Sequence, residues 1–271
     1  MFYLMPSIEM FFLLLFIGAA TGSITSIIKI APALIAIPAL YFFLPVFNLS
    51  FEHLMLPAIA TCITAFIPAH LYAWIISMKK GEVDSQQLLN FAPGIAMGGV
   101  IGAQLLSLSS LFVFKIAFSL ITLIAVANIV FRSRSEALHI VQVGKTWNLP
   151  IGLIIGVLSL VAGNCGHTLG HLLCRFKKVE AKLEQGTSNG FVVFASIAAM
   201  VGFIYPAQTF DHIGLTGFAG AVQLPSMIIL SCSHLFFYWL CHKRGNTLDK
   251  SVLSISVIVF MAFSVFRLWI S

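Results

Sequence analysis

Long apolar runs separated by short polar segments dominate the sequence, and they restrict the chain to folds that a lipid bilayer can solvate. A helix that crosses the hydrocarbon core needs roughly 20 residues at about 1.5 Å each. In the first half the runs lie at about 10–28, 31–47, 53–77, 88–107 and 111–131. In the second half they lie near 149–163, 165–174, 184–206, 215–241 and 251–270. The last three runs of each half reach that length, whereas the first two of the second half are too short.

A shortage of charged residues supports the same conclusion. Only 9% of the residues are charged, whereas a soluble domain carries about 25% because water must solvate its surface. Inside a bilayer the backbone N–H and C=O groups must pair within the protein, and helices achieve this segment by segment. We therefore predict an all-α polytopic membrane protein whose surroundings are the lipid bilayer.

The net charge of +6 does not indicate a nucleic-acid partner, because the basic residues cluster in short loops between apolar runs. The positive-inside rule places such loops in the cytoplasm. The clusters are Lys79–Lys80, Arg132/Arg134/Lys145, Arg175/Lys177/Lys178/Lys182 and Lys243/Arg244/Lys250.

Other class-defining motifs are missing from the sequence. The cysteines form no Cys-x2-Cys pair, so neither a disulfide framework nor a zinc knuckle is predicted. The first ten residues contain no Lys or Arg and include Glu9, unlike the basic start of a signal peptide, so we expect the first apolar run to be retained. There is no Gly-x-Ser-x-Gly, His-Glu-x-x-His or phosphate-binding loop. We predict neither an enzyme nor a cofactor.

The two halves resemble each other in the spacing of small and hydroxyl residues. Gly18, Gly22, Thr25 and Lys29 align with Gly152, Gly156, Ser159 and Gly163 at a constant offset of 134 residues. Further on, Ala60-Thr61-Cys62 aligns with Gly186-Thr187-Ser188 at an offset of 126 residues. We predict a repeat of five segments that occurs twice, over 1–135 and 149–271, joined by a cytoplasmic linker at 136–148.

The basic loops predict that these two repeats are inverted. Two crossings separate the Lys79 loop from the loop at 132–145, and two separate the loop at 175–182 from that at 243–250. With all four loops in the cytoplasm, the third run enters it, its counterpart leaves it, and both termini lie outside. Each repeat opens with a broken or re-entrant helical hairpin, and the sequence alone does not decide between these. Such paired, interrupted segments are typical of secondary transporters, which bind substrate at the breaks.

Glycine motifs at the start of each half are similar to those of a known family. The matching residues are Gly18, Gly22 and Pro38 in the first half, and Gly152, Gly156, Gly163, Gly166 and Glu184–Ser188 in the second. Ala58–Cys62, Lys79–Asp84, Pro93, Gly94, Gly98 and Gly102 also fit. With these residues the chain resembles the TauE/SafE family of sulfite and organosulfur anion exporters. The resemblance implies transport of sulfite, thiosulfate or a small organosulfonate, in a multi-pass protein of a bacterial inner membrane.

The chain departs from that family at the two breaks, where the family has Gly-x-Gly-Gly-Gly. The first break reads Lys29-Ile30-Ala31-Pro32-Ala33, and the second reads Gly163-Asn164-Cys165-Gly166-His167. Lys29 either supplies positive charge for an anion near the middle of the membrane or reaches the cytoplasmic surface. His167 stands where donors to an oxyanion would point, and its charge would switch near pH 6.5.

A soft-metal site is the alternative at the second break, since Cys165, His167 and His171 supply a thiol and two imidazoles, and His171 lies one turn after His167. No second cluster completes the site, and we interpret His171 as a membrane-facing or packing residue beside the basic loop. Arg175 and its basic neighbours are interpreted as topology determinants.

Hydroxyl and amide donors complete the predicted site. Thr61 and Thr187 recur in both halves, with Ser188 beside the second, although such residues often only pack between membrane helices. The favoured hypothesis is a secondary transporter of a small inorganic or organosulfur anion that works by alternating access. Its predicted substrate-binding residues are Lys29, Thr61, Asn164, His167, Thr187 and Ser188. The alternatives are a carrier of a transition metal or sulfur species, and a membrane scaffold that transports nothing.

Overall fold

A computed structural model describes residues 8–130, 147–177, 179–207, 210, 217–244 and 249–270. These residues fold into ten α-helices with very little strand. Seven of the helices are long and apolar enough to cross a membrane. The predicted all-α polytopic membrane fold is therefore confirmed, and the chain is an integral, multi-pass membrane protein.

The first half contains five α-helices, and a short 3₁₀-helix follows the second. They are α1 (Ile8–Ile28), α2 (Ala33–Phe43), η1 (Leu44–Phe47), α3 (Phe51–Lys79), α4 (Ser85–Leu108) and α5 (Leu111–Val130). The second half contains α6 (Asn148–Val161), α7 (His167–Phe176), α8 (Ala181–Ile204), α9 (Leu224–Arg244) and α10 (Lys250–Ile270). At about 1.5 Å per residue, α6 and α7 are about 21 Å and 15 Å long. Neither spans a hydrocarbon core of about 30 Å, as predicted for the opening pair of this half.

The run predicted from residue 215 becomes helical only at Leu224. Before it, β1 (Phe218–Ala219) and β2 (Val222–Gln223) form a small antiparallel hairpin. Gly217 and Gly220 have φ angles of 84° and 62°, which glycine adopts without steric cost and which interrupt a helix. Most of the predicted linker at 136–148 and the loop at 132–145 lie outside the described residues.

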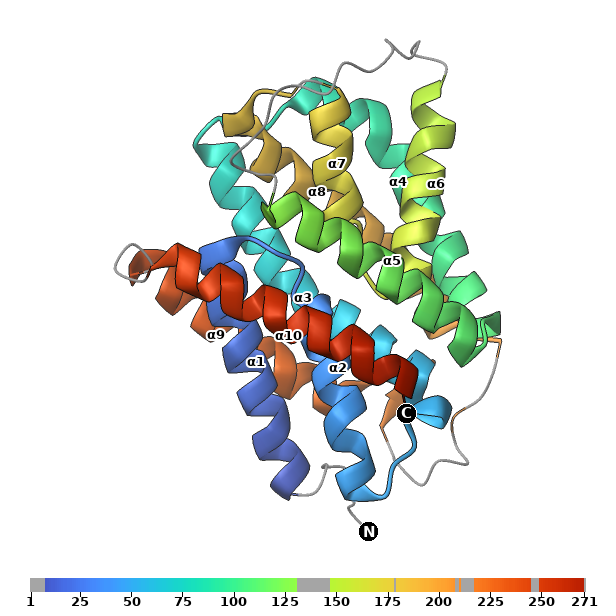
Figure 1. Cartoon of the computed structure of the whole chain (residues 1–271). Coiled ribbons are helices and arrows are strands. Elements are labelled where there is room, and N and C mark those ends of the chain that lie inside the picture. Colours follow the sequence, from blue (N-terminus) through green and yellow to red (C-terminus); the bar gives the residue numbers. More distant parts are fainter. Residues whose placement is uncertain are drawn as a thin grey trace.

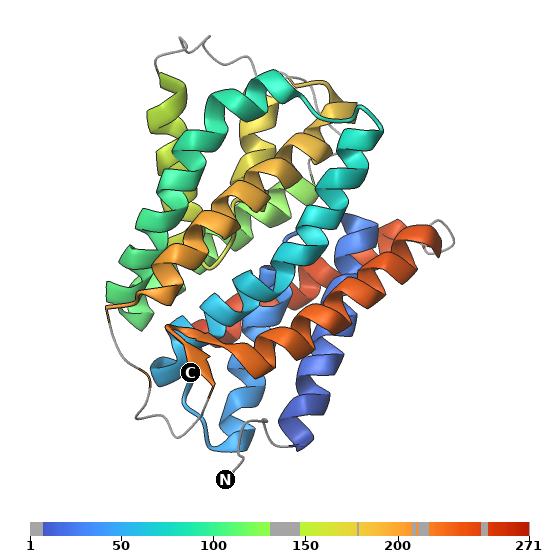
Figure 2. The ribbon, with the colours of Figure 1, turned by 180° about the vertical axis from the view of Figure 1, so that it is seen from behind.

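The helices gather into two lobes, each of which combines elements of both halves. One lobe contains α6, α7 and α8 with α4 of the first half, and the other contains α1, α2 and α3 with α9 of the second half. In Figures 1 and 2 these lobes lie at opposite ends of the molecule. They meet where α3 contacts α8, and α5 contacts α10. Each helix of the first half has a counterpart in the second, from α1 and α6 to α5 and α10. When every helix is replaced by its counterpart, the same pairs of helices are in contact.

Glycines allow the closest helix pairs to approach in the same way in both lobes. A Cβ placed on Gly22 of α1 would collide with the carbonyl oxygen of His234 on α9. A Cβ placed on Gly156 of α6 would lie 2.5 Å from the carbonyl oxygen of Ile95 on α4. Small residues are how membrane helices bring their backbones together. The glycines spaced four residues apart, Gly18/Gly22 and Gly152/Gly156, are therefore helix-packing faces.

A second repeated feature ties each central helix to the start of a neighbour. The Thr61 hydroxyl on α3 accepts the backbone N–H of Gln223, just before α9, at 3.0 Å. The Thr187 hydroxyl on α8 accepts the backbone N–H of Asp84, just before α4, at 2.9 Å. The side chains of Gln223 and Asp84 each accept the N–H three residues further on. Each capping residue is thereby fixed to the opposite half of the chain.

Most of the basic segments between helices lie on one side of the molecule. In Figures 1 and 2 the end of α3, the turn from α7 to α8 and the end of α9 lie on one side. The start of α1, the turn from α4 to α5 and the end of α10 lie on the other. Of the described basic residues, Lys79, Lys80, Lys182 and Lys243 belong to helix ends on the first side, whereas Lys115 near the start of α5 and Arg267 in the last turn of α10 belong to the other. Which of the two sides faces the cytoplasm stays a prediction, as does the inversion of the repeats.

Candidate functional site

The two breaks begin with the same kind of helix end. Lys29 follows α1 with a φ of 62°, and its N–H bonds to the carbonyl of Thr25 at 3.0 Å, which is a left-handed helix cap. Gly163 follows α6 with a φ of 68°. Its N–H bonds to Leu160 and that of Asn164 bonds to Ser159, which is a Schellman motif. Both caps stop a helix and turn the chain back.

The starts of the following helices differ. Around Pro32, which has no N–H to offer, local turns satisfy the N–H groups of Leu34 and Ile35. The second break ends at Gly166, the N-cap of α7, which has a φ of 90°; neither Pro32 before α2 nor Gly166 before α7 supplies a side-chain cap. The positive end of the α7 dipole therefore lies at the second break. His167 and Thr168, both buried, occupy its first two positions.

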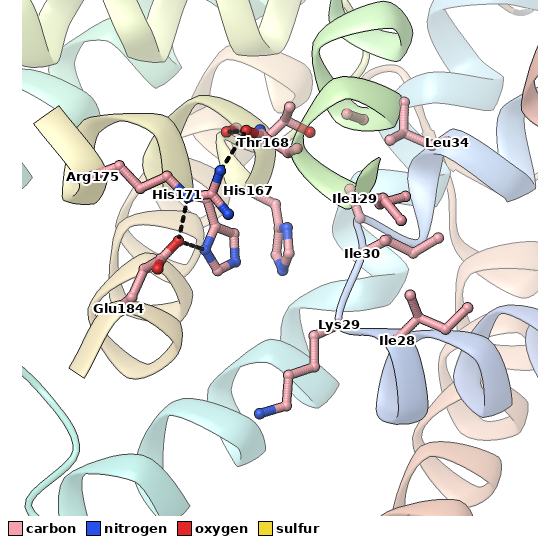
Figure 3. Close-up of a pocket in the computed structure, with 13 residues that line it drawn as sticks. Ile28, Lys29, Ile30, Leu34, Ile129, His167, Thr168, His171, Arg175 and Glu184 are labelled. Carbon is pink, nitrogen blue, oxygen red and sulfur yellow. Dashed lines mark hydrogen bonds and ion pairs between the residues drawn. The ribbon is translucent and has the colours of Figure 1, made fainter. Parts of the chain in front are cut away.

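A pocket between the lobes joins the two breaks (Figure 3). This inner pocket has a volume of about 50 Å³. Besides apolar residues of α1, α2 and α5, its polar lining is Lys29, Asn128, His167, Thr168, His171, Arg175 and Glu184. Lys29 of the first break and His167 of the second, 138 positions apart in sequence, thus line one pocket. In Figure 3 Lys29 lies across the pocket from His171 and Glu184, and its exposed side chain extends away from His167.

An ion-pair network forms the wall made by α7 and α8. Glu184 Oε1 lies 2.9 Å from His171 Nδ1 and 3.4 Å from Arg175 Nε. Arg175 Nη1 also donates to Asn128 Oδ1 of α5 at 3.4 Å. The three charged or titratable side chains are 15% to 21% exposed, which leaves them in contact with the pocket but largely shielded from bulk water.

A larger cavity, here called the vestibule, adjoins the inner pocket on the side of the basic residues. Its volume is about 310 Å³, and Lys29, His171 and Glu184 line both cavities. Other polar groups around it come from α3, α8 and α9, and include Lys80, Lys182, Asn189, Tyr238 and His242. Three lysines face two glutamates, Glu82 and Glu184. The formal charge around the vestibule therefore favours an anion over a cation.

The remaining predicted residues are placed as follows. Asn164 is buried and donates from Nδ2 to the Thr168 hydroxyl at 2.9 Å. Ser188 is buried and donates to the carbonyl of His167 at 3.3 Å. Both therefore hold the start of α7. Thr61 lines a separate, mostly apolar cavity beside α9, and Thr187 lines neither the inner pocket nor the vestibule.

Several residues of the site were not predicted from the sequence, or were interpreted differently. Arg175 pairs with Glu184 and lines the inner pocket, so it does more than determine topology. His171, interpreted as a membrane-facing or packing residue, bonds to Glu184 and lines both cavities. Their spacing of four residues, on one face of α7, is a signal that a search for paired charges would have found. His70 of α3, whose ring centroid lies 6.2 Å from that of His167, had no such signal.

The soft-metal alternative gains no support from the geometry. Cys165 and His167 are buried near the second break, while His171 is engaged with Glu184. Across the part of the chain that the structure describes, no three His, Cys, Asp or Glu side chains converge as they would to hold a metal ion.

Comparison with known proteins identifies the family of the chain. The family described as sulfite exporter TauE/SafE matches residues 14–268, nearly the whole chain. No curated protein and no solved structure matches. That family consists of membrane transporters of sulfur-containing anions and not of enzymes. With its seven long apolar helices and a match over almost its full length, the chain belongs to the TauE/SafE sulfite exporter family.

Proposed function

We propose that this chain is a secondary transporter that carries sulfite, thiosulfate or a small organosulfonate across a bacterial inner membrane by alternating access. The observation that carries the proposal is the inner pocket, where Lys29 of the first break and His167 of the second break line the same space between two lobes. A pocket between lobes can open to one side of the membrane and then to the other as the lobes rock.

The anion binds between Lys29 and the start of α7. Lysine supplies a full positive charge, and the first turn of α7 supplies N–H donors and the positive end of its dipole. The left-handed cap at Lys29 fixes the position from which its side chain enters the two cavities. His167 adds an imidazole beside the same helix start, and one of its ring nitrogens donates to the anion.

Asn164 and Ser188 act on this site through the backbone and side chains of α7. Asn164 holds Thr168, and Ser188 holds the carbonyl of His167. Their role is to fix the position and direction of the first turn of α7. Substituting either one weakens anion binding by loosening the donors.

Thr61 and Thr187 hold the starts of neighbouring helices in place and do not bind the anion. Each hydroxyl is occupied by the N–H of a capping residue from the opposite half, and Thr187 also donates to the carbonyl of Leu183. The recurrence of this bond, of the glycine contacts and of the left-handed caps supports two structurally equivalent, inverted repeats. We place the anion in the inner pocket, where the two breaks meet.

The test is uptake of radiolabelled sulfite and thiosulfate by proteoliposomes that contain purified protein. Wild type is compared with Lys29→Ala, His167→Ala and the control Lys79→Ala, whose side chain is exposed and lines neither cavity. We expect flux in wild type and control, and its loss in the other two variants. Flux that survives both substitutions would move the site elsewhere, and no flux of any small oxyanion would refute the function.

A further inference from the structure

Glu184 is a carboxylate placed where an anion transporter would be expected to avoid negative charge. It lines both the inner pocket and the vestibule, and its Oε1 atom lies 2.9 Å from His171 Nδ1. An anion in either cavity is repelled by an ionised Glu184 and attracted by a protonated His171. Adding one proton to this pair therefore favours anion binding, whichever of the two atoms carries it.

The other charged and titratable groups around the pair come from every element that packs on it. On α7 itself these are His167 and Arg175, and α5 contributes the neutral Asn128. The break after α1, the end of α3, the start of α8 and the end of α9 contribute Lys29, Lys80, Glu82, Lys182, Tyr238 and His242. Cations predominate in this set, so the surroundings of the pair remain positively charged when the pair loses its proton. What the proton changes is the net charge that Glu184 and His171 together present to the anion, which goes from one negative charge to none.

A series of imidazoles leads from the pair toward the centre of the protein. The His171 ring centroid lies 4.7 Å from that of His167, which in turn lies 6.2 Å from that of His70 on α3. His171 Nε2 is buried and has no hydrogen-bond partner among the described residues, so it is available on the side away from Glu184. A neutral imidazole carries one N–H donor and one acceptor nitrogen, so neighbouring rings offer both roles to a proton. The series thus joins α3 of one lobe to α7 and α8 of the other.

We propose that Glu184 and His171 form a proton-binding site and that the chain moves a proton together with its anion. This inference rests on the proposed function and adds the coupling ion to it. The proton enters from water on one side of the membrane, is held between Glu184 Oε1 and His171 Nδ1 while the anion is bound, and leaves to water on the other side. Because linkage is reciprocal, the bound anion also raises the affinity of the pair for the proton.

The test uses anions of strong acids, thiosulfate and an alkanesulfonate, so that protonation of the substrate does not imitate coupling. Wild-type proteoliposomes containing a pH-sensitive dye receive an anion gradient with no initial pH gradient. We expect protons to move in the same direction as the anion. Net flux should rise about 10-fold from about pH 8 to about pH 6, within the range typical of linked sites.

The decisive variant is Glu184→Gln, which keeps the size and the acceptor oxygen but binds no proton. We expect proton movement to be lost and the pH dependence of net flux to fall below about 2-fold, while exchange of anion between two equally loaded sides continues. His171→Gln is the second variant, and His53→Gln on the exposed start of α3 is the matched control. Each variant must elute as wild type does on size exclusion.

The outcomes separate this inference from the proposed function. Anion flux in wild type without proton movement would overturn the coupling and leave the transporter intact. A Glu184→Gln variant with the pH dependence of wild type would also overturn it. No flux of either anion in wild type would refute both. If Glu184→Gln does not fold, His171→Gln and the ratio of protons to anions in wild type decide the question.

Discussion

Lys29 and Gly163 stand at the same position of their two halves and adopt the same left-handed backbone conformation, with φ angles of 62° and 68°. Glycine takes this conformation freely, whereas a residue with a Cβ pays about 1–2 kcal/mol for it. The chain thus keeps a lysine where the backbone alone would favour glycine. A strained residue of this kind is a reason to look for a function of its side chain.

Replacing Lys29 by Gly separates the two effects. We expect Lys29→Gly to leave the free energy of unfolding unchanged or to raise it by up to about 1 kcal/mol, because glycine adopts the left-handed conformation without strain. Anion transport should be lost all the same, because the charge is gone. Lys29→Arg keeps both the strain and the charge and should retain part of the activity. Full transport by Lys29→Gly, measured by flux into proteoliposomes, would show that the lysine has no role in binding.

The glycine faces predict a large effect of a small side chain. A Cβ on Gly98 of α4 would lie 2.9 Å from the Cα of Gly156 on α6. We expect Gly98→Val to destabilise the fold by about 1–3 kcal/mol, because the helices must separate. Thermal unfolding in detergent measures this, with Ser256→Val on the exposed face of α10 as the control. Equal midpoints for the two variants would mean that α4 and α6 do not pack this closely.

The hydrogen bonds that Thr61 and Thr187 make to the capping residues predict matched effects in the two halves. Thr61→Val and Thr187→Val each leave a backbone N–H, of Gln223 or Asp84, without its acceptor. We expect each to lower stability by about 1–3 kcal/mol and to leave the KM for anion within about 2-fold. Thr61→Ser and Thr187→Ser should restore stability, since they keep the hydroxyl. A rise in KM with unchanged stability would instead return these residues to the anion site.

Much of the fold is predictable from the sequence because each apolar run encodes one local helix. The breaks after α1 and α6 are also local, since Pro32, Gly163 and Gly166 interrupt the runs there. Which helices pair is not a local property. The contact of α1 with α9, and of α4 with α6, depends on glycine faces meeting across the chain.

In the candidate site, too, the local features were predictable from the sequence and the contacts between helices were not. Lys29 and His167 stood out because they replace glycines at the breaks, and both line the inner pocket. The ion pair between Glu184 and Arg175 did not, because it depends on the angle at which α7 turns back along α8. Thr61 and Thr187 recur in the sequence for a reason that only the hydrogen bonds show, namely the repeated capping contact.

Inverted repeats predict opposite directions for the two central helices. In a background without native cysteines, single cysteines replace Ser50 and Lys80 at the ends of α3, and Glu180 and Tyr205 at the ends of α8. All four positions are exposed. We expect an impermeant thiol reagent to label Lys80→Cys and Glu180→Cys from the cytoplasm, and Ser50→Cys and Tyr205→Cys from outside. Labelling of Ser50→Cys and Glu180→Cys from one side would mean parallel repeats.

Equilibrium binding of radiolabelled thiosulfate to purified protein tests the central claim, a cationic anion site at the junction of the two breaks, most directly. Wild type, Lys29→Ala and the control Lys79→Ala are compared at low and high chloride. We predict saturable binding that is weakened about 10- to 100-fold in Lys29→Ala, as expected for loss of a charge-assisted contact, and unchanged in Lys79→Ala. Saturable binding of equal strength in all three proteins would contradict a site at Lys29.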